Sequence, residues 1–353
     1  MDEKISKIEQ SIQNLKNKNS RIYFFVQDTK GNARASVRYI YQMAMSLKES
    51  GYNSIILHEK PDYTPVSSWL SEKYMELPHK AVEGQNLEIS PEDTIIVPEI
   101  FGYIMAQISN LTCAKIVLNQ AYDHIFETLQ PGQSWQQLGF TKCITTTEKQ
   151  KEYIGVTMKG VSIDVIEPYI TEVFEPSKYP AKPIVTIHSR EQRESINIIK
   201  AFYQKFPQFR WISFRDMRAL PEEEFANSLK ESMLSVWIDP TSGFGTYPLE
   251  SMKLGVAVIG KVPNLVPEWM DEKNGIWVED SIKLVDYIAD FIQNWLEDNI
   301  SEDLYNTAFE TAKKYSDKNE FETKVIKLFE SYSNARISNF ESELNKLTST
   351  VNE

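Results

Sequence analysis

Apolar and polar residues alternate in blocks along the chain, and the blocks predict strands that alternate with helices. Residues 21–26 and 94–98 are short apolar runs bounded by polar residues, as expected of buried parallel strands. Residues 33–50 repeat apolar positions at helical spacing and stop before Gly51. Since parallel strands need a crossover connection, which is usually a helix, this order predicts an α/β fold. Further strands are predicted at 52–58, 115–118, 142–146, 184–188, 211–214, 234–238 and 256–259.

The length and the proline spacing predict two domains. A chain of 353 residues is long enough for two separate cores. Prolines gather between residues 167 and 183, which is typical of an interdomain linker. We therefore predict two Rossmann-like domains with additional terminal helices. Their bounds are a helix at 1–19, a first domain at 20–170, a second domain at 171–320 and a helix at 321–353.

The two terminal segments carry apolar residues at alternating spacings of three and four, which is the seam of a coiled coil. Two heptads at the amino end are too short to stand alone. The first helix therefore docks on its own domain, pairs with the last helix, or joins a second subunit in a homo-oligomer. The apolar positions are Ile5, Ile8, Ile12 and Leu15 in the first helix, and Ile337, Phe340, Leu344, Leu347 and Val351 in the last.

A candidate anion-binding site lies in the second domain. The strand at 234–238 runs into a turn that contains Gly243 and Gly245, and a helix begins near Thr246. The free amides of a helix N-terminus, just beyond the carboxyl end of a strand, bind anions in α/β sheets. The glycines let the backbone approach a phosphate closely. Glu250, one turn into the helix, is placed to accept hydrogen bonds from sugar hydroxyls.

Arg190 and Arg193 follow the strand at 184–188 and precede a helix. Guanidinium groups bind phosphate oxygens through two parallel hydrogen bonds and keep their charge. Arginines at a helix start oppose the helix dipole, so a merely structural role is disfavoured. We therefore predict that both bind a diphosphate.

The first domain places other polar residues at the carboxyl ends of its strands. Gln120, Asp123 and His124 follow the strand at 115–118, and Gly31 lies in the loop after the strand at 21–26. That loop lacks the Gly-x-Gly-x-x-Gly spacing of dinucleotide-binding proteins, which disfavours NAD.

The stretch Gly243-Phe244-Gly245, followed by Leu249-Glu250-Ser251-Met252, resembles the donor-site signature of the GT-B glycosyltransferases, family 4 in particular. Ser242 stands where the family has a glutamate. The resemblance implies two Rossmann-like domains that face a cleft. It also implies transfer of a sugar from a nucleotide-sugar donor to a hydroxyl group, with retention of configuration and without a metal.

The resemblance also implies roles for individual residues. Arg190 and Arg193 correspond to the Arg and Lys that hold the diphosphate, and Gln120 to a histidine near the reacting sugar. Together with His124 and Glu250 they form the predicted catalytic set, and Asp123 is assigned to the acceptor. The predicted donor-binding residues are Gly31, Ser242, Gly243, Phe244, Gly245, Thr246, Arg215 and Met217, the last two beside the base.

Composition narrows the partners and the compartment. A net charge of −12 argues against broad nucleic-acid binding. Cys113 and Cys143 have no metal-ligand spacing, no apolar run is long enough to span a membrane, and the amino terminus lacks a signal-peptide core, so a cytoplasmic enzyme with reduced thiols is expected.

The expected co-substrate is a UDP- or GDP-sugar, with no further cofactor. The acceptor stays open among a glycan, a lipid-linked group, a protein and a modified nucleic acid, and its contacts are expected from first-domain loops such as 59–92. Two alternatives remain: a non-catalytic GT-B-like scaffold, and a glycosyltransferase that acts on modified DNA bases.

Overall fold

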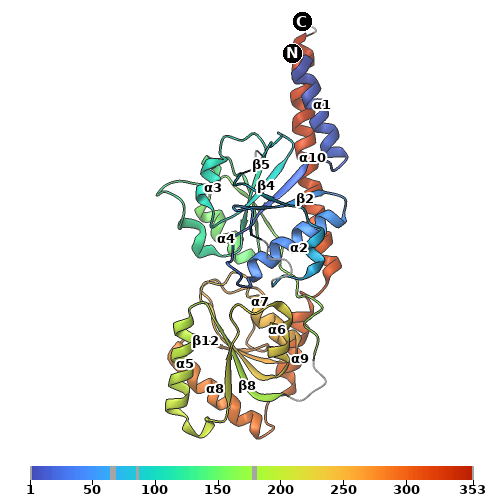
Figure 1. Cartoon of the computed structure of the whole chain (residues 1–353). Coiled ribbons are helices and arrows are strands. Elements are labelled where there is room, and N and C mark those ends of the chain that lie inside the picture. Colours follow the sequence, from blue (N-terminus) through green and yellow to red (C-terminus); the bar gives the residue numbers. More distant parts are fainter. Residues whose placement is uncertain (1, 64–68, 85–86, 177–180, 352–353) are drawn as a thin grey trace. The chain divides into compact units, whose positions relative to one another are not determined.

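The structure is a computed structural model that describes residues 2–63, 69–84, 87–176 and 181–351 (Figure 1). The chain divides into two compact units. Unit 1 comprises Met1–Thr145, Lys151–Ile166 and Asn319–Glu353, and unit 2 comprises Thr146–Gln150 and Glu167–Lys318. Of the proline-rich segment, residues 177–180 lie outside the described residues, as do 64–68 and 85–86 of the loop at 59–92.

Unit 1 is built on a seven-stranded sheet of order β3-β2-β1-β4-β5-β6-β7, in which every described pairing is parallel. The predicted α/β fold is confirmed. The strands are β1 (Arg21–Phe25), β2 (Asn53–His58), β3 (His79–Ala81), β4 (Thr94–Pro98), β5 (Ala114–Asn119), β6 (Lys142–Thr145) and β7 (Ser162–Val165), and the helices α2 (Ala35–Glu49), α3 (Gly102–Gln107) and α4 (Glu148–Thr157) connect them.

The interior strand β1 is apolar because both of its faces are covered. Tyr23 and Phe25 belong to a core cluster that includes residues of α3 and α4, and the Phe25 ring meets Phe101 edge-on at 4.7 Å. On the other face, Phe24 lies 6.4 Å from Phe329 of α10 (Lys318–Val351). A strand buried on both sides needs an unbroken apolar run, which is the pattern that predicted it.

Unit 2 has a five-stranded parallel sheet of order β12-β11-β10-β8-β9. Its central strand β10 is buried along all seven residues. The strands are β8 (Lys182–Ser189), β9 (Ser213–Asp216), β10 (Ser232–Ile238), β11 (Ala257–Lys261) and β12 (Ile276–Val278), and the helices are α5 (Gln192–Lys205), α6 (Glu222–Lys230), α7 (Thr246–Lys253), α8 (Ser281–Leu296) and α9 (Glu302–Lys313).

The predicted strand at 211–214 is wrong by two residues, since β9 is Ser213–Asp216. The Ile212 amide donates to the Phe209 carbonyl in the preceding turn, and Trp211 is 49% exposed. The apolar run therefore begins in the turn, and Arg215 lies within the strand instead of after it.

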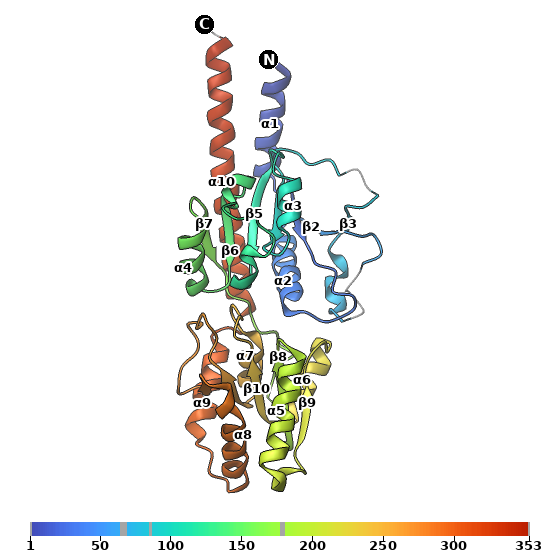
Figure 2. The same ribbon diagram turned by 90° about the vertical axis from the view of Figure 1, so that its left-hand side faces the viewer.

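The two terminal helices pair with each other, which was one of the three predicted arrangements. Lys4 and Lys16 of α1 (Asp2–Lys16) form ion pairs with Glu343 and Glu341 of α10 at 2.9 Å, and the two helices lie side by side in Figures 1 and 2. Arg336 of α10 donates to the carbonyl of Glu92, which fastens this helix beside the amino end of β4. Association with a second subunit stays a prediction.

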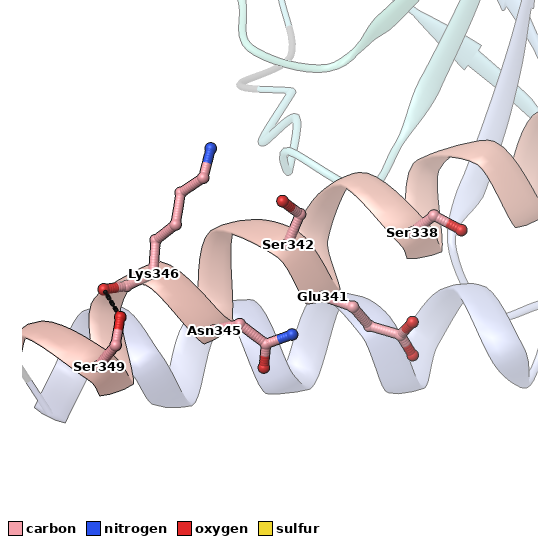
Figure 3. Close-up of a pocket in the computed structure, with 6 residues that line it drawn as sticks. All are labelled: Ser338, Glu341, Ser342, Asn345, Lys346 and Ser349. Carbon is pink, nitrogen blue, oxygen red and sulfur yellow. Dashed lines mark hydrogen bonds between the residues drawn. The ribbon is translucent and has the colours of Figure 1, made fainter.

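A shallow polar groove follows one face of α10 beyond this anchor (Figure 3). It lies on the side of the sheet where β4 begins, so it is separate from the carboxyl ends of the strands, where α/β proteins bind ligands. The groove is lined by Ser338, Glu341, Ser342, Asn345, Lys346 and Ser349.

Composition led to two expectations, one about membrane-spanning segments and one about the cysteines. In the described part of the chain, no helix combines the length and the hydrophobicity that crossing a bilayer requires. Cys113 and Cys143 are buried free thiols.

Candidate functional site

Three neighbouring strands of unit 2 bring charged groups to the carboxyl edge of the sheet. Arg190 follows β8, Asp239 follows β10, and Lys261 ends β11. The Arg190 amide donates to the carbonyl of Ile238 at 3.1 Å, and its guanidinium donates to the hydroxyl of Thr241. The same guanidinium lies 3.6 Å from the Asp239 carboxylate. Arg190 is therefore held against the loop that leads into α7.

The loop at 239–245 is fixed from several sides. The Asn264 amide, after β11, donates to the Pro240 carbonyl at 2.8 Å. The indole nitrogen of Trp269 donates to the Phe244 carbonyl at 2.7 Å. Thr241 donates its amide to the Asp239 carboxylate. A loop held in this way can present its amides to an anion without first losing conformational entropy.

Gly245 is the residue before α7 and has a left-handed backbone, with φ of 76°. A Cβ placed there would lie 3.0 Å from the Trp237 ring and 3.3 Å from the Trp269 ring. Both the backbone angle and the packing therefore require glycine. This turn starts the helix at Thr246, and the first amides of α7 have no partner within the helix. They provide the positive end of the helix dipole at this edge.

The remaining residues of the signature are placed by α7. Glu250 is only 2% exposed, one turn into the helix. Tyr247 stacks on His188 of β8 with ring centroids 5.0 Å apart. Gly243 and Phe244 are buried, whereas Ser242 and Thr246 are half-buried. The structure thus brings the signature and Arg190 together within unit 2.

The electrostatics of this edge combine cations with half-buried acids. Burial raises the pKa of Asp239, and the nearby Arg190 opposes that shift. Burial likewise raises the pKa of Glu194, opposed by Lys261. Lys261 is a basic group that the sequence reasoning missed. A lysine that ends an otherwise buried apolar strand was the available signal.

Three other residues of unit 2 were predicted to bind the donor. Arg193 is exposed in the first turn of α5. Arg215 forms an ion pair with Glu231, at 2.7 Å, and Lys182 of β8 pairs with the same carboxylate. Met217 is 1% exposed and belongs to a core cluster with Tyr247. Their roles in donor binding stay predictions.

At the carboxyl edge of the unit 1 sheet, a buried carboxylate organises the segment after β5. Glu99, which follows β4, is 3% exposed. One of its oxygens accepts the amides of Gln120, at 3.1 Å, and Ala121, at 2.8 Å. The Gln120 side chain then donates to the carbonyl of Ser36 at the start of α2. Glu99 was missed because a single acid after an apolar run carries no motif.

Other predicted residues of unit 1 lie in the loops at this edge. His124 bonds to Glu127 at 2.7 Å through Nδ1, and Asp123 is half-buried in the short 3₁₀ helix Tyr122–Phe126. Gly31 is exposed with φ of 79° in the loop after β1. The structure places Gln120, Asp123 and His124 on one segment, and their roles in transfer stay predictions.

The pKa of Glu99 leads to a stability prediction. Burial raises this pKa from 4.5 to about 7, and hydrogen bonds from backbone amides and the nearby His124 oppose the shift. Cys143 interacts electrostatically with the same carboxyl group. Because the folded pKa exceeds the unfolded one, stability is lost as the pH rises from about 4.5 to about 7. Glu99→Gln keeps the accepting oxygen and cannot ionise.

The parent should lose stability over this range, whereas Glu99→Gln should not. We therefore expect the melting temperature of the variant minus that of the parent to increase by roughly 5 °C from pH 5 to pH 8. Differential scanning calorimetry across this range checks it. A difference between the two proteins that does not change with pH would contradict the prediction.

Over 2–63, 69–84, 87–176 and 181–351, no three His, Cys, Asp or Glu side chains gather in a way that could hold a metal ion.

The chain is similar to known glycosyltransferases in sequence and in fold. No protein-family model matches the chain. An alpha-1,6-glucosyltransferase of Actinobacillus pleuropneumoniae serotype 7 is 24% identical over 239 residues, which covers 63% of this chain and 71% of that protein.

Solved structures are similar over most of the chain. A sucrose-phosphate synthase from Thermosynechococcus elongatus has a TM-score of 0.66 at 13% identity, covering 90% of this chain and all of that one. HepE of Anabaena, solved with UDP and glucose, has a TM-score of 0.65 at 13% identity over 88% of this chain and all of that one. The fold is therefore that of the GT-B glycosyltransferases.

Proposed function

We propose that the protein is a glycosyltransferase of the retaining, family 4-like kind, which moves a sugar from a nucleotide-sugar donor to an acceptor hydroxyl. The observation that carries the proposal is the position of Arg190. Its guanidinium contacts Thr241 and Asp239 of the loop that leads to the N-terminus of α7. The glucosyltransferase relative supports the same activity.

In this proposal, unit 2 stabilises the negative charge of the departing diphosphate. As the bond between the sugar and the phosphate breaks, charge grows on the phosphate oxygens. Arg190, Lys261 and the first amides of α7 supply positive charge and hydrogen-bond donors to those oxygens. The phosphate oxygen takes the proton from the incoming acceptor hydroxyl, so the side chains need only bind and orient. Glu250 accepts hydrogen bonds from the donor's sugar hydroxyls.

UDP-glucose is the first donor to test. The relative from A. pleuropneumoniae is named a glucosyltransferase, and HepE has been solved with UDP-glucose. The name of the relative points to glucose, and the HepE complex points to a uridine nucleotide and glucose. In unit 2, Met217 remains the residue proposed beside the base, whereas the ion pair with Glu231 holds the Arg215 guanidinium near the amino ends of β8 and β10.

Calorimetric titration with UDP and with GDP tests nucleotide binding. We expect UDP to bind and UDP-glucose to release UDP when an acceptor is supplied, and NMR of the product to show an α-glycosidic bond, as in the donor. If neither nucleotide binds, the result would favour the alternative of a non-catalytic GT-B-like scaffold. A β-linked product would refute retention while leaving the transferase activity in place.

A further inference from the structure

Exposed aromatic side chains lie at the carboxyl edge of the unit 1 sheet, outside the residues assigned above. Tyr103, in the first turn of α3 after β4, is 44% exposed, and Phe126, after β5, is 49% exposed. Aromatic side chains supply large contact areas at binding surfaces. Both come from loops that leave the carboxyl ends of neighbouring strands.

Contacts tie these loops into one surface. The Tyr103 hydroxyl donates to the Glu59 carboxylate, just after β2, at 3.4 Å. The Gly102 amide donates to the Thr128 hydroxyl at 3.0 Å, and a Cβ at Gly102 would overlap Thr128. The loop that carries Tyr103 therefore lies directly against the segment that carries Phe126.

Polar groups accompany the rings. Glu127 is held by His124 next to Phe126. His58, the last residue of β2, is 2% exposed, and neither of its ring nitrogens has a hydrogen-bond partner among the described residues. Burial lowers the pKa of His58 to about 4, so the imidazole is neutral and offers one donor and one acceptor. A buried polar group without a protein partner is usually completed by water or a ligand.

We propose that Tyr103 and Phe126, with Glu59 and Glu127, form an acceptor subsite for a neutral saccharide. This inference rests on the proposed transferase function and names its acceptor class. A pyranose ring has an apolar C–H face that stacks on aromatic rings, and hydroxyls that carboxylates accept. The carboxylates beside the rings repel phosphate-bearing acceptors, which disfavours nucleic acid and lipid phosphate. The charged groups interrupt the apolar surface that a lipid chain needs.

The test measures saccharide binding to the full chain without donor, by saturation-transfer NMR and calorimetry. The probes are glucose, maltose, isomaltose, cellobiose and N-acetylglucosamine. We expect at least one to bind, and Tyr103→Ala or Phe126→Ala to weaken it roughly 5- to 10-fold, as the loss of one aromatic contact predicts. UDP affinity and melting temperature should stay unchanged in both variants.

Two exposed aromatic residues of unit 2 provide matched controls. Tyr287→Ala and Trp211→Ala remove rings of similar exposure, 41% and 49%, and should not alter saccharide binding.

The outcomes separate this inference from the proposed function. UDP binding without any saccharide binding, or saccharide binding that Tyr103→Ala and Phe126→Ala leave intact, would overturn the subsite alone. If the protein binds DNA or vesicles with phosphate headgroups, and both variants lose this binding, the subsite would also be overturned in favour of another acceptor class. Saccharide binding that both variants weaken, in a protein that binds no nucleotide, would uphold the subsite and refute the donor site.

Discussion

Replacing Arg190 by alanine is expected to weaken UDP and UDP-glucose binding roughly 10- to 150-fold. Hydrogen bonds from a charged group contribute about 1.5–3 kcal/mol. Thr241 and Asp239 hold this guanidinium beside the loop that leads into the N-terminus of α7. Turnover should fall further, because the charge on the diphosphate grows in the transition state. Calorimetry and UDP release measure the two effects.

Two further variants separate binding from folding. Arg210 is an exposed arginine that precedes β9, so Arg210→Ala should bind UDP like the parent. Arg190→Ala also leaves the half-buried Asp239 without its guanidinium, which lowers stability. Adding Asp239→Asn should restore the melting temperature and not UDP binding. A folded Arg190→Ala protein with parental UDP affinity would refute the assignment of the donor site to this edge.

Gly245→Ala is expected to destabilise unit 2 by about 2–5 kcal/mol. A left-handed backbone costs a residue with a side chain about 1–2 kcal/mol. The new Cβ would also press on Trp237 and Trp269, and overpacking adds about 1–3 kcal/mol. The loss should appear in calorimetry as a lower melting temperature, together with weaker UDP binding because the start of α7 moves.

Gly255→Ala is the matched control for this change. Gly255 has nearly the same φ, 75°, but a Cβ there meets nothing within 4 Å. It should therefore lose only the backbone part of the effect. If both variants lose the same stability, the packing of Gly245 against the two tryptophans contributes nothing, and the argument for a close-packed loop fails.

The elements of the fold were largely predictable from local pattern. Buried parallel strands must be apolar on both faces, so β1 and β4 stood out as apolar runs, and β10 stood out as an apolar run interrupted only by serine. Elements with weak local signals were missed. The strand β3 has three residues, two of them polar, and α4 mixes polar and apolar residues on its faces. The start of β9 was misplaced because Trp211 and Ile212 extend its apolar run into a turn.

By itself, the sequence determined the alternation of strands and helices, the glycine turn before α7 and the presence of Arg190 after a strand, because each depends on neighbours in the chain. Only the tertiary structure decided which groups meet. Arg190 reaches Asp239 and Thr241 because β8 lies beside β10, and Glu99 holds Gln120 because β4 lies beside β5. The same applies to Tyr103, Glu59 and Thr128. Strand order is set by how the sheets bury their faces over long sequence distances, and no local pattern records it.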